Sequence, residues 1–427
     1  MRRFFGTDGV RGRVGEPPMT PEFLLALGRA AGEELAGPFV LGRDTRASGP
    51  MLASALVAGL LWSGAEVHDL GVMPTPGVAY LTAVYRARAG AVISASHNPY
   101  RDNGVKFLTG QGEKLPDATE AAIEGRLAAP SPYREGGRRL LAPEGTERYL
   151  AHLLDHAPDL IGKRIVVDAA NGAAYRLAPE LFSRAGAEVF AIGTSPDGRN
   201  INRGLGATAP APMARAVRDL GYDLGVALDG DGDRAILADR RGRVVTGDHL
   251  LYLHARVAGE PAVVGTVMSN LGLERALKAA GVRLHRAPVG DRYVYEVLVR
   301  EGLRLGAEPS GHMIFRDRFA TGDGLLTALL TLAALEASGT DLADWVDALP
   351  LFPQVIRNVP VADKRRVAAH PGLPDLVAEA ERRLGDGRVN VRPSGTEPVV
   401  RVMVEGPDRA AVEAVAGWLA ERLSGLE

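Results

Sequence analysis

The chain has 427 residues, of which 46% are hydrophobic and 24% charged, and its formal net charge is −2. This composition is typical of a globular protein, and the length suggests about three domains, with two or four as the alternatives. The absence of cysteine excludes disulfides, thiolate catalysis and cysteine-ligated metals. The near-neutral charge excludes a global basic field for nucleic acid or an anionic membrane.

No segment has the pattern of a signal peptide or a membrane span. The N-terminal MRRFFGTDGVRG carries two arginines but no long apolar region after them. The most apolar stretch, residues 324–334, is too short to cross a bilayer and predicts a buried helix. We therefore expect a cytoplasmic protein.

Short β-type runs alternate with Ala- and Leu-rich helical runs along most of the chain, which favours α/β units with largely parallel sheets. The predicted strands are 39–41, 66–70, 89–94, 164–168, 188–192, 224–228, 262–267, a short strand near 283 and 303–305. The predicted helices are 50–63, 177–185, 212–220, 273–280 and 293–300. The last part differs, with strands at 354–360, 389–391 and 399–405 and helices at 374–384 and from 408.

This order of elements predicts three similar mixed α/β domains and a smaller, antiparallel α+β domain at the C-terminus. The boundaries are expected in the Pro-, Gly- and charge-rich stretch 129–138, near the turn 239–242 and near 349–353. The domains predicted in this way are 1–137, 138–240, 241–350 and 351–427.

A motif of three aspartates, Asp229-Gly-Asp231-Gly-Asp233-Arg234, follows the apolar strand YDLGVAL. The glycines permit a tight loop, and three carboxylates at alternate positions can surround one cation. An EF-hand is excluded because its positions 6 and 12 hold Arg234 and Arg240. We interpret the motif as a Mg²⁺ or Ca²⁺ site rather than a solvated turn.

Ser96 lies in SASHNP, residues 94–99, also directly after an apolar strand. Open α/β sheets bind ligands at this end of their strands, and His97 beside it is a candidate base. No G-x-S-x-G elbow surrounds the serine, so a hydrolase triad is poorly supported. Taken alone, the pattern leaves a functional serine and an ordinary Asn-Pro turn equally open.

Two further motifs lie nearer the C-terminus. The first, Glu308-Pro-Ser310-Gly-His312, suits the binding of sugar hydroxyls, although a helix cap is an equal alternative. The second favours phosphate, because arginine forks, hydroxyls and a glycine amide are good phosphate donors. Its residues are Arg392, Ser394, Gly395, Thr396 and Arg401. No P-loop pattern occurs, so nucleotide binding of that kind is not indicated.

Three polar segments in the N-terminal quarter are weak signals when each is taken alone. They are FGTDGVRG with Arg11, GRDTR at 42–46, and DNGVK with Lys106. FGTDGVRG, SASHNP with DNGVKF, DGDGDR, E-x-SGH and RPSGTEP occur in this order along the chain, and this combination closely resembles the α-D-phosphohexomutase superfamily. The resemblance extends from residue 5 to residue 401. It implies four domains around a central active-site cleft, of which the fourth closes on the substrate phosphate.

Within the superfamily, the sequence is most similar to the bacterial members that interconvert glucosamine 6-phosphate and glucosamine 1-phosphate for UDP-N-acetylglucosamine and peptidoglycan synthesis. The stretches that carry this likeness are VVDAANGAAY (166–175), VMSNLGL (267–273), VGDRYV (289–294), TGDGLLTAL (321–329) and RPSGTEPVVRVM (392–403). Ala307 replaces an expected glycine before Glu308, and Pro309 occupies a variable position.

The resemblance implies a phosphoserine at Ser96, one Mg²⁺ on Asp229, Asp231, Asp233 and a Ser96 phosphate oxygen, and a sugar 1,6-bisphosphate intermediate. Arg234 would stabilise the transferred group, and His97, Lys106 and Arg11 are unranked candidates for the proton transfers. The sugar would be held by Glu308, Ser310 and His312, and the distal phosphate by the arginine motif, residues 392–401. The expected partner is a small sugar phosphate, without nucleic acid or membrane, and a homodimer is left open.

Three other functions compete with this interpretation. A phosphomannomutase or phosphoglucomutase would use the same chemistry on another sugar, and only the stretches near Glu308 and 290–292 argue against it. A silent sugar-phosphate sensor would need neither Ser96 nor three aspartates. A phosphatase would result if the phosphate on Ser96 passed to water.

Overall fold

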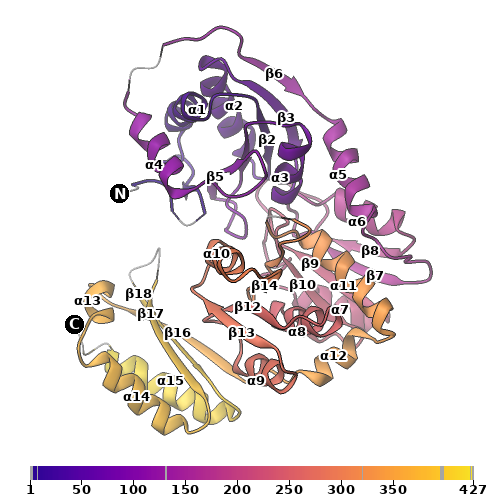
Figure 1. Ribbon diagram of the computed structural model, residues 1–427, viewed down its shortest axis with the longest axis vertical. Coiled ribbons are helices and arrows are strands. Elements are labelled where there is room, and N and C mark those ends of the chain that lie inside the picture. The colour runs from indigo at the N-terminus through magenta and orange to yellow at the C-terminus, as the bar shows by residue number, and fades with distance from the viewer. Residues whose placement is uncertain are drawn as a thin grey trace.

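The computed structural model describes residues 3–6, 8–129, 132–319, 321–394, 399–423 and 425. Four sheets follow one another along the chain. Figure 1 shows them in an arc, with the indigo N-terminal part at one end and the yellow C-terminal part at the other. We refer to the sheets, with the helices that pack on them, as the first to fourth domains. The predicted class, three α/β domains followed by a smaller α+β domain, is confirmed.

The first domain has a six-stranded sheet in the order β1-β5-β4-β2-β3-β6, with β1 and β5 antiparallel to their neighbours. Helices α1 and α2 cross at Gly28 and Gly59, where an added Cβ would meet backbone at 2.2 Å on either side. The elements are β1 (Val10–Arg13), α1 (Pro21–Leu35), β2 (Phe39–Arg43), α2 (Gly49–Trp62), β3 (Glu66–Val72), α3 (Thr75–Val84), β4 (Ala89–Ile93), β5 (Asp102–Thr109), α4 (Asp117–Arg126) and β6 (Arg138–Leu141).

The second domain has a five-stranded sheet in the order β11-β10-β9-β7-β8. Strands β8, β7 and β9 are parallel, and β10 and β11 are antiparallel. Its elements, with the connecting helix α5, are α5 (Glu144–Leu154), β7 (Arg164–Asp168), α6 (Leu177–Arg184), β8 (Glu188–Ile192), α7 (Ala211–Leu220), β9 (Leu224–Leu228), β10 (Ala235–Asp239) and β11 (Val244–Val245).

The third domain has a four-stranded sheet in the order β13-β12-β14-β15, in which only β15 is antiparallel. Helix α11 extends beyond its own sheet and packs on β9 and β10 of the second domain. The elements are α8 (Gly247–Val257), β12 (Ala262–Thr266), α9 (Leu271–Ala279), β13 (Arg283–Ala287), α10 (Asp291–Glu301), β14 (Leu305–Ala307), β15 (Met313–Phe315), α11 (Gly324–Ser338) and α12 (Leu342–Ala348).

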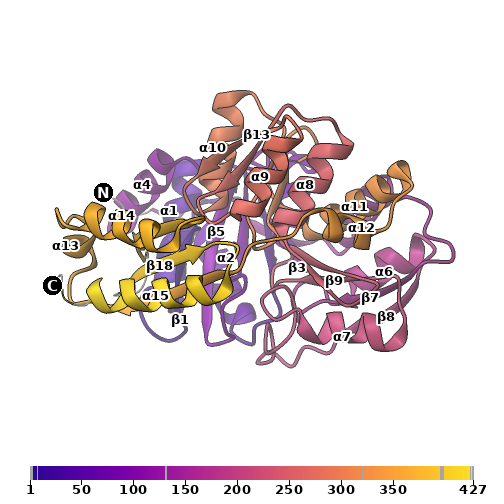
Figure 2. The ribbon, with the colours of Figure 1, turned by 90° about the horizontal axis from the view of Figure 1, so that it is seen from below.

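The fourth domain has a three-stranded antiparallel sheet in the order β16-β18-β17. Helices α14 and α15 lie side by side against it, as both views show (Figures 1 and 2). The elements are β16 (Gln354–Pro360), α13 (Lys364–Ala368), α14 (Leu373–Leu384), β17 (Arg388–Pro393), β18 (Val399–Glu405) and α15 (Arg409–Leu423).

The apolar cores divide the molecule differently from the sheets. One buried cluster runs from Val40 through Leu181 and Leu250 to Leu349 and so joins the first three domains. The fourth domain has a separate cluster that includes Val402 and Leu419. Burial of apolar surface therefore holds the first three domains together more firmly than it holds the fourth.

The chain leaves its first two sheets later than the predicted boundaries. Strand β6 pairs with β3, so the first sheet continues to Leu141, beyond the predicted end at 137. Strand β11 pairs with β10 at 244–245, beyond the predicted end at 240. The strand expected at 303–305 begins only at Leu305 and continues to Ala307. Loop composition shows where turns lie, but a short strand that follows a turn can still pair with a strand of the preceding sheet.

Among the described residues, no single helix has the length and apolar composition needed to cross a membrane. Helices α11 and α12 have that length and composition only when they are counted as one segment, and the two helices are bent by 86° at the break between them.

Candidate active site

Three of the predicted motifs occupy the same topological position in three different sheets. Each joins a parallel strand to the antiparallel strand that follows it: 94–101 between β4 and β5, 229–234 between β9 and β10, and 308–312 between β14 and β15. Contacts between these segments bring Ser96, the aspartates and His312 together. The repeated position explains how motifs about 80 to 130 residues apart in the sequence form one site.

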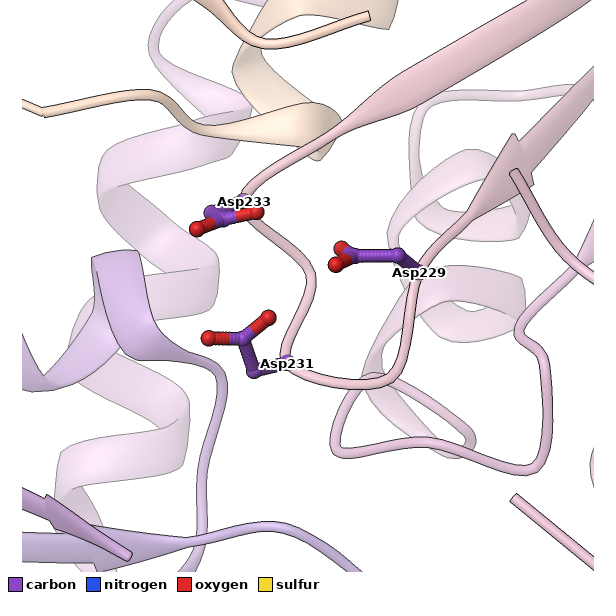
Figure 3. Close-up of side chains that lie close together, drawn as sticks. All are labelled: Asp229, Asp231 and Asp233. Carbon is purple, nitrogen blue, oxygen red and sulfur yellow. The ribbon is translucent and has the colours of Figure 1, made fainter. Parts of the chain in front are cut away.

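The three aspartates form a compact group of carboxylates. One oxygen from each of Asp229, Asp231 and Asp233 lies within 4.8 Å of the others, and all three residues are buried. Figure 3 shows the carboxylates converging from the loop between β9 and β10. Burial and the two neighbouring carboxylates raise the pKa of Asp229 well above its usual range. This concentration of negative charge needs a cation or protons to be stable.

A metal ion fits this group. Within the described part of the chain, the Oδ1 atoms of Asp231 and Asp233 are buried and accept no hydrogen bond. Buried oxygens without a donor are costly, whereas a divalent cation with oxygen ligands would satisfy them. Gly230 has Ser96 O beside it, where an added Cβ would come within 2.5 Å, so glycine allows the two loops to approach.

Ser96 is aimed at the aspartates. It is 2% exposed, and its hydroxyl donates to Asp229 Oδ2 at 2.7 Å. His97 Nδ1 lies 3.2 Å from the same hydroxyl oxygen. Burial, with the charges of Arg234 and Arg11, lowers the pKa of His97 to about 4. The imidazole is therefore neutral at pH 7 and has a lone pair for a proton.

Two cationic side chains, Lys106 and Arg234, lie against the carboxylates, and a third, Arg11, is linked to Lys106 through Asp8. Lys106 Nζ donates to Asp231 Oδ2 at 2.8 Å, and Arg234 Nε lies 3.8 Å from Asp233 Oδ1. Arg11 pairs with Asp8, whose carboxylate is 3.7 Å from Lys106. Burial alone would lower the pKa of Lys106, but the facing carboxylates outweigh it and raise that pKa far above its usual range.

The predicted sugar loop borders the metal loop. Glu308 is buried and accepts from Gly290 N at 3.0 Å, while Ser310 is half-buried. His312 Nδ1 lies 3.7 Å from Asp233 Oδ1. Burial alone would lower the pKa of His312, but Asp233 and other carboxylates raise it to about 9. His312 also lines a cavity of about 340 Å³ between the first and third domains.

The predicted phosphate motif lies on the fourth domain. Arg392 in β17 faces Arg401 in β18 across the antiparallel pair. Burial and the charge of Arg401 lower the pKa of Arg392. Ser394 is buried, and its carbonyl accepts from Lys364 Nζ at 2.6 Å. Gly395 and Thr396 lie outside the described residues. Two guanidinium groups placed opposite each other favour an anion between them.

The sequence did not predict four side chains that organise the site. Thr75 donates to Asp231 Oδ2 at 2.6 Å, and Lys114 bridges Asp8 and Asp291 at 2.7 Å to each. The other two, Arg46 and Asn202, donate to the backbone of the serine loop. Only Arg46 belonged to a quoted motif, GRDTR. The others act across long separations in the sequence, where local patterns carry no signal.

Comparison with known proteins agrees with this arrangement. Four family models match in succession: Phosphoglucomutase/phosphomannomutase alpha/beta/alpha domain I at residues 2–134, domain II at 147–242, domain III at 246–352, and the C-terminal domain at 357–422. The chain therefore belongs to the phosphoglucomutase/phosphomannomutase family, whose members are mutases.

The similar curated proteins carry one particular name. The chain is 59% identical to a phosphoglucosamine mutase of Thermus thermophilus, with 100% of this chain and 98% of the other covered. It is 52% identical to phosphoglucosamine mutase of Deinococcus radiodurans, with 98% and 97% covered.

Solved structures show the same fold at lower identity. A phosphoglucomutase/phosphomannomutase family protein from Burkholderia thailandensis has a TM-score of 0.80 at 24% identity, with 100% and 98% of the two chains covered. N-acetylphosphoglucosamine mutase from Aspergillus fumigatus, in complex with GlcNAc-6P and magnesium, has a TM-score of 0.73 at 18% identity, with 99% and 96% covered.

Proposed function

We propose that this chain interconverts glucosamine 6-phosphate and glucosamine 1-phosphate through a phosphorylated Ser96 and a sugar 1,6-bisphosphate. The observation that carries the proposal is that the buried hydroxyl of Ser96 donates to Asp229 Oδ2 at 2.7 Å, and that Asp229 belongs to a group of three carboxylates. A pure binding protein needs no such serine. The likeness to phosphoglucosamine mutases over nearly the full length supports the choice of sugar.

Asp229, Asp231 and Asp233 would hold the magnesium ion, together with an oxygen of the Ser96 phosphate. Their oxygens are the ligands that Mg²⁺ prefers, and two of those oxygens have no hydrogen-bond donor among the described residues. When bound, the ion supplies neutralisation of the charge on the transferring phosphoryl group. Arg234, beside Asp233, adds a second positive charge on the same side.

The first transfer breaks the bond between Ser96 Oγ and phosphorus and forms a bond from phosphorus to the free sugar hydroxyl. The proton of that hydroxyl passes to a base, and among the candidates His97, Lys106 and Arg11 only the neutral His97 has a lone pair to accept it. Lys106 and Arg11 carry their protons and would serve as acids or as neutralising charges. The bisphosphate then turns end for end. In the second transfer, its other phosphorus bonds to Ser96 Oγ, and the freed sugar oxygen takes back a proton.

The sugar must bind in two orientations for both phosphoryl transfers to take place. Glu308, Ser310 and His312 would contact sugar hydroxyls present in both poses. The distal phosphate would be held by Arg392, Ser394, Gly395, Thr396 and Arg401. Because these two grips lie on different domains, movement of the fourth domain would exclude water from the phosphoserine.

The experiment that tests the proposal compares purified protein on several sugar phosphates with Mg²⁺ and glucose 1,6-bisphosphate present. We expect kcat/KM to be highest for the glucosamine phosphates. A higher value for mannose or glucose phosphates would identify the alternative mutase. Release of inorganic phosphate without isomerisation would identify a phosphatase, and absence of any turnover would favour a sensor.

A further inference from the structure

We infer that Arg46 is the positioning residue of the serine loop, and that Asn202 of the second domain acts with it on the same two carbonyls. The inference rests on the proposed function, because it concerns how Ser96 is held for phosphoryl transfer. Arg46 does not approach the reacting atoms through its own charge. It acts on the backbone of the segment that carries Ser96.

The guanidinium of Arg46 is fully engaged. The residue is 1% exposed, and its side chain is the largest fully buried one in the described part of the chain. Its Nη2 donates to Ser96 O at 2.9 Å and to Asn98 O at 2.8 Å. Its Nη1 donates to Asp102 O at 3.0 Å and to Pro99 O. Three carbonyls of the serine loop and the first carbonyl of β5 are thus held by one side chain.

The fifth donor anchors the guanidinium to the sheet. Arg46 Nε donates to Asp44 Oδ2 at 2.8 Å, and that oxygen also accepts from Ser94 Oγ at 2.6 Å. Ser94 Oγ in turn accepts from Ser96 N at 2.9 Å. Because the charge of Arg46 is paired with Asp44, this arginine is part of a frame and is not free to bind phosphate.

The backbone that this frame supports is unusual. Ser96 has a φ of +50°, in the left-handed region that residues with a side chain seldom adopt. Such a conformation persists only where the surroundings hold it. Here Ser96 N is held by Ser94 and Ser96 O by Arg46, while the hydroxyl is left to meet Asp229.

Asn202 provides a second hold from another domain. Its Nδ2 donates to Ser96 O at 2.9 Å and to Asn98 O at 3.2 Å, the two carbonyls that Arg46 Nη2 contacts. Asn202 is itself left-handed, with a φ of +58°, and its backbone N donates to Ala170 O at 2.9 Å. The position of Ser96 therefore depends on how the first two domains meet.

Lysine cannot replace Arg46, because it has three donors on one nitrogen and cannot reach five acceptors in a plane. We expect Arg46→Lys to lower the rate of Ser96 phosphorylation by glucose 1,6-bisphosphate on the order of 10- to 100-fold, as small misplacements of reacting groups do. The half-saturating bisphosphate concentration should change less than about threefold, because the ligand contacts lie elsewhere.

Asn202→Gly is the second variant, since glycine accepts the left-handed backbone but removes the amide. It should also slow phosphorylation. Because both side chains act on Ser96 O, the loss in the double variant should differ from the product of the single losses by about threefold or more. The control is Arg243→Lys. Arg243 donates to the buried Asp239 and to Ala343 O, and it lies at the end of β10 that is far from the metal loop.

The experiment measures how fast Ser96 gains phosphate in a single turnover. Intact-protein mass spectrometry monitors the gain, and only variants shown to be folded are compared. A folded Arg46→Lys protein that gains phosphate at the wild-type rate would overturn the inference. So would strictly multiplicative losses in the double variant, or an equal loss in Arg243→Lys. If the wild-type protein gains no phosphate, the proposed function fails and the inference falls with it.

Discussion

The serine loop and the phosphate motif of the fourth domain are built in opposite ways. Residues 94–96 of the serine loop are buried, the carbonyl of Ser96 accepts from Arg46 and Asn202, and its hydroxyl donates to Asp229. The phosphate motif sets Arg392 against Arg401 on a domain with its own core. The contrast indicates that the bond-making groups are preorganised in the three joined domains, whereas the grip on the distal phosphate is carried by a more independent part.

The contacts that connect the fourth domain support this contrast. They include several hydrogen bonds: Arg388 donates to Ser269 O, Asn270 Nδ2 donates to Phe352 O, and Glu405 accepts from Leu271 N. Polar contacts can be exchanged for water at lower cost than buried apolar surface. Variants of the serine loop and metal group should therefore affect the chemical step, and variants of the fourth domain should affect binding.

Ser96→Ala should have the largest effect. The substitution removes the atom that carries the phosphate while keeping the buried volume nearly constant, so activity should fall about 10³-fold or more. No phosphate should be gained from glucose 1,6-bisphosphate, as measured by mass spectrometry. Ser183→Ala, on the exposed side of α6, is the control. Phosphate gained by the Ser96→Ala protein would contradict the assignment.

Asp231→Asn should have the next largest effect. It removes one carboxylate from the metal group and the partner of Lys106. We expect activity to fall on the order of 10²-fold and the Mg²⁺ concentration for half-maximal activity to rise. Titration with MgCl₂ after treatment with EDTA measures both. Asp219→Asn, on the surface, should behave as wild type. Wild-type activity that survives EDTA would exclude the metal function.

The sequence predicted the elements whose local signals were strong and unambiguous. Strands β7, β8, β9, β16 and β18 begin and end at the predicted residues, because each is an apolar or alternating run bounded by turns. Helix α1 was missed, although Thr20 accepts from Phe23 N and Pro21 begins the helix, which are recognisable start signals. Strand β5 was quoted only as a motif, because DNGVK resembles a turn.

The site was predictable in its chemistry and less so in its framework. Ser96 and the aspartates belong to contiguous motifs, and their proximity was expected from the resemblance to the α-D-phosphohexomutase superfamily. Asn202 contributes through a contact 106 residues away in the sequence, to a backbone carbonyl, so no side-chain pattern marks it. Lys114 likewise acquires its role only when Asp8 and Asp291 come together from different domains.

Arg401→Ala tests the phosphate motif of the fourth domain and should affect binding more than the chemical step. Hydrogen bonds to charged groups contribute about 1.5–3 kcal/mol, so KM for the sugar phosphate should rise on the order of 10- to 100-fold. The rate of Ser96 phosphorylation at saturating bisphosphate should fall much less. Arg409→Ala, which removes an exposed arginine from α15 in the same domain, is the control. A large fall in kcat with unchanged KM would reverse the proposed division of labour.

Asp248→Asn should have the smallest effect and tests the region where the third domain meets the fourth. Asp248 lies in the first turn of α8, and its Oδ2 accepts from the backbone N of Asn270, whose side chain donates to Phe352 O. Burial raises the pKa of Asp248 to about 6, although hydrogen bonds from Asn270 and Ser269 lower it. An unfolded aspartate titrates near a pKa of about 3.9, so the folded protein binds this proton more tightly.

The sign of the pH dependence follows from that difference. Protonation of Asp248 stabilises the folded state as the pH falls from about 6 toward 4, and above pH 6 the buried charge costs stability. Asp248→Asn removes that cost, so we expect it to raise stability by about 1–2 kcal/mol at pH 7.5, with the gain shrinking toward pH 4.5. Thermal unfolding of both proteins at the two pH values measures the difference. A variant less stable than wild type at pH 7.5 would show that the charged carboxylate, accepting from Asn270, holds this junction together.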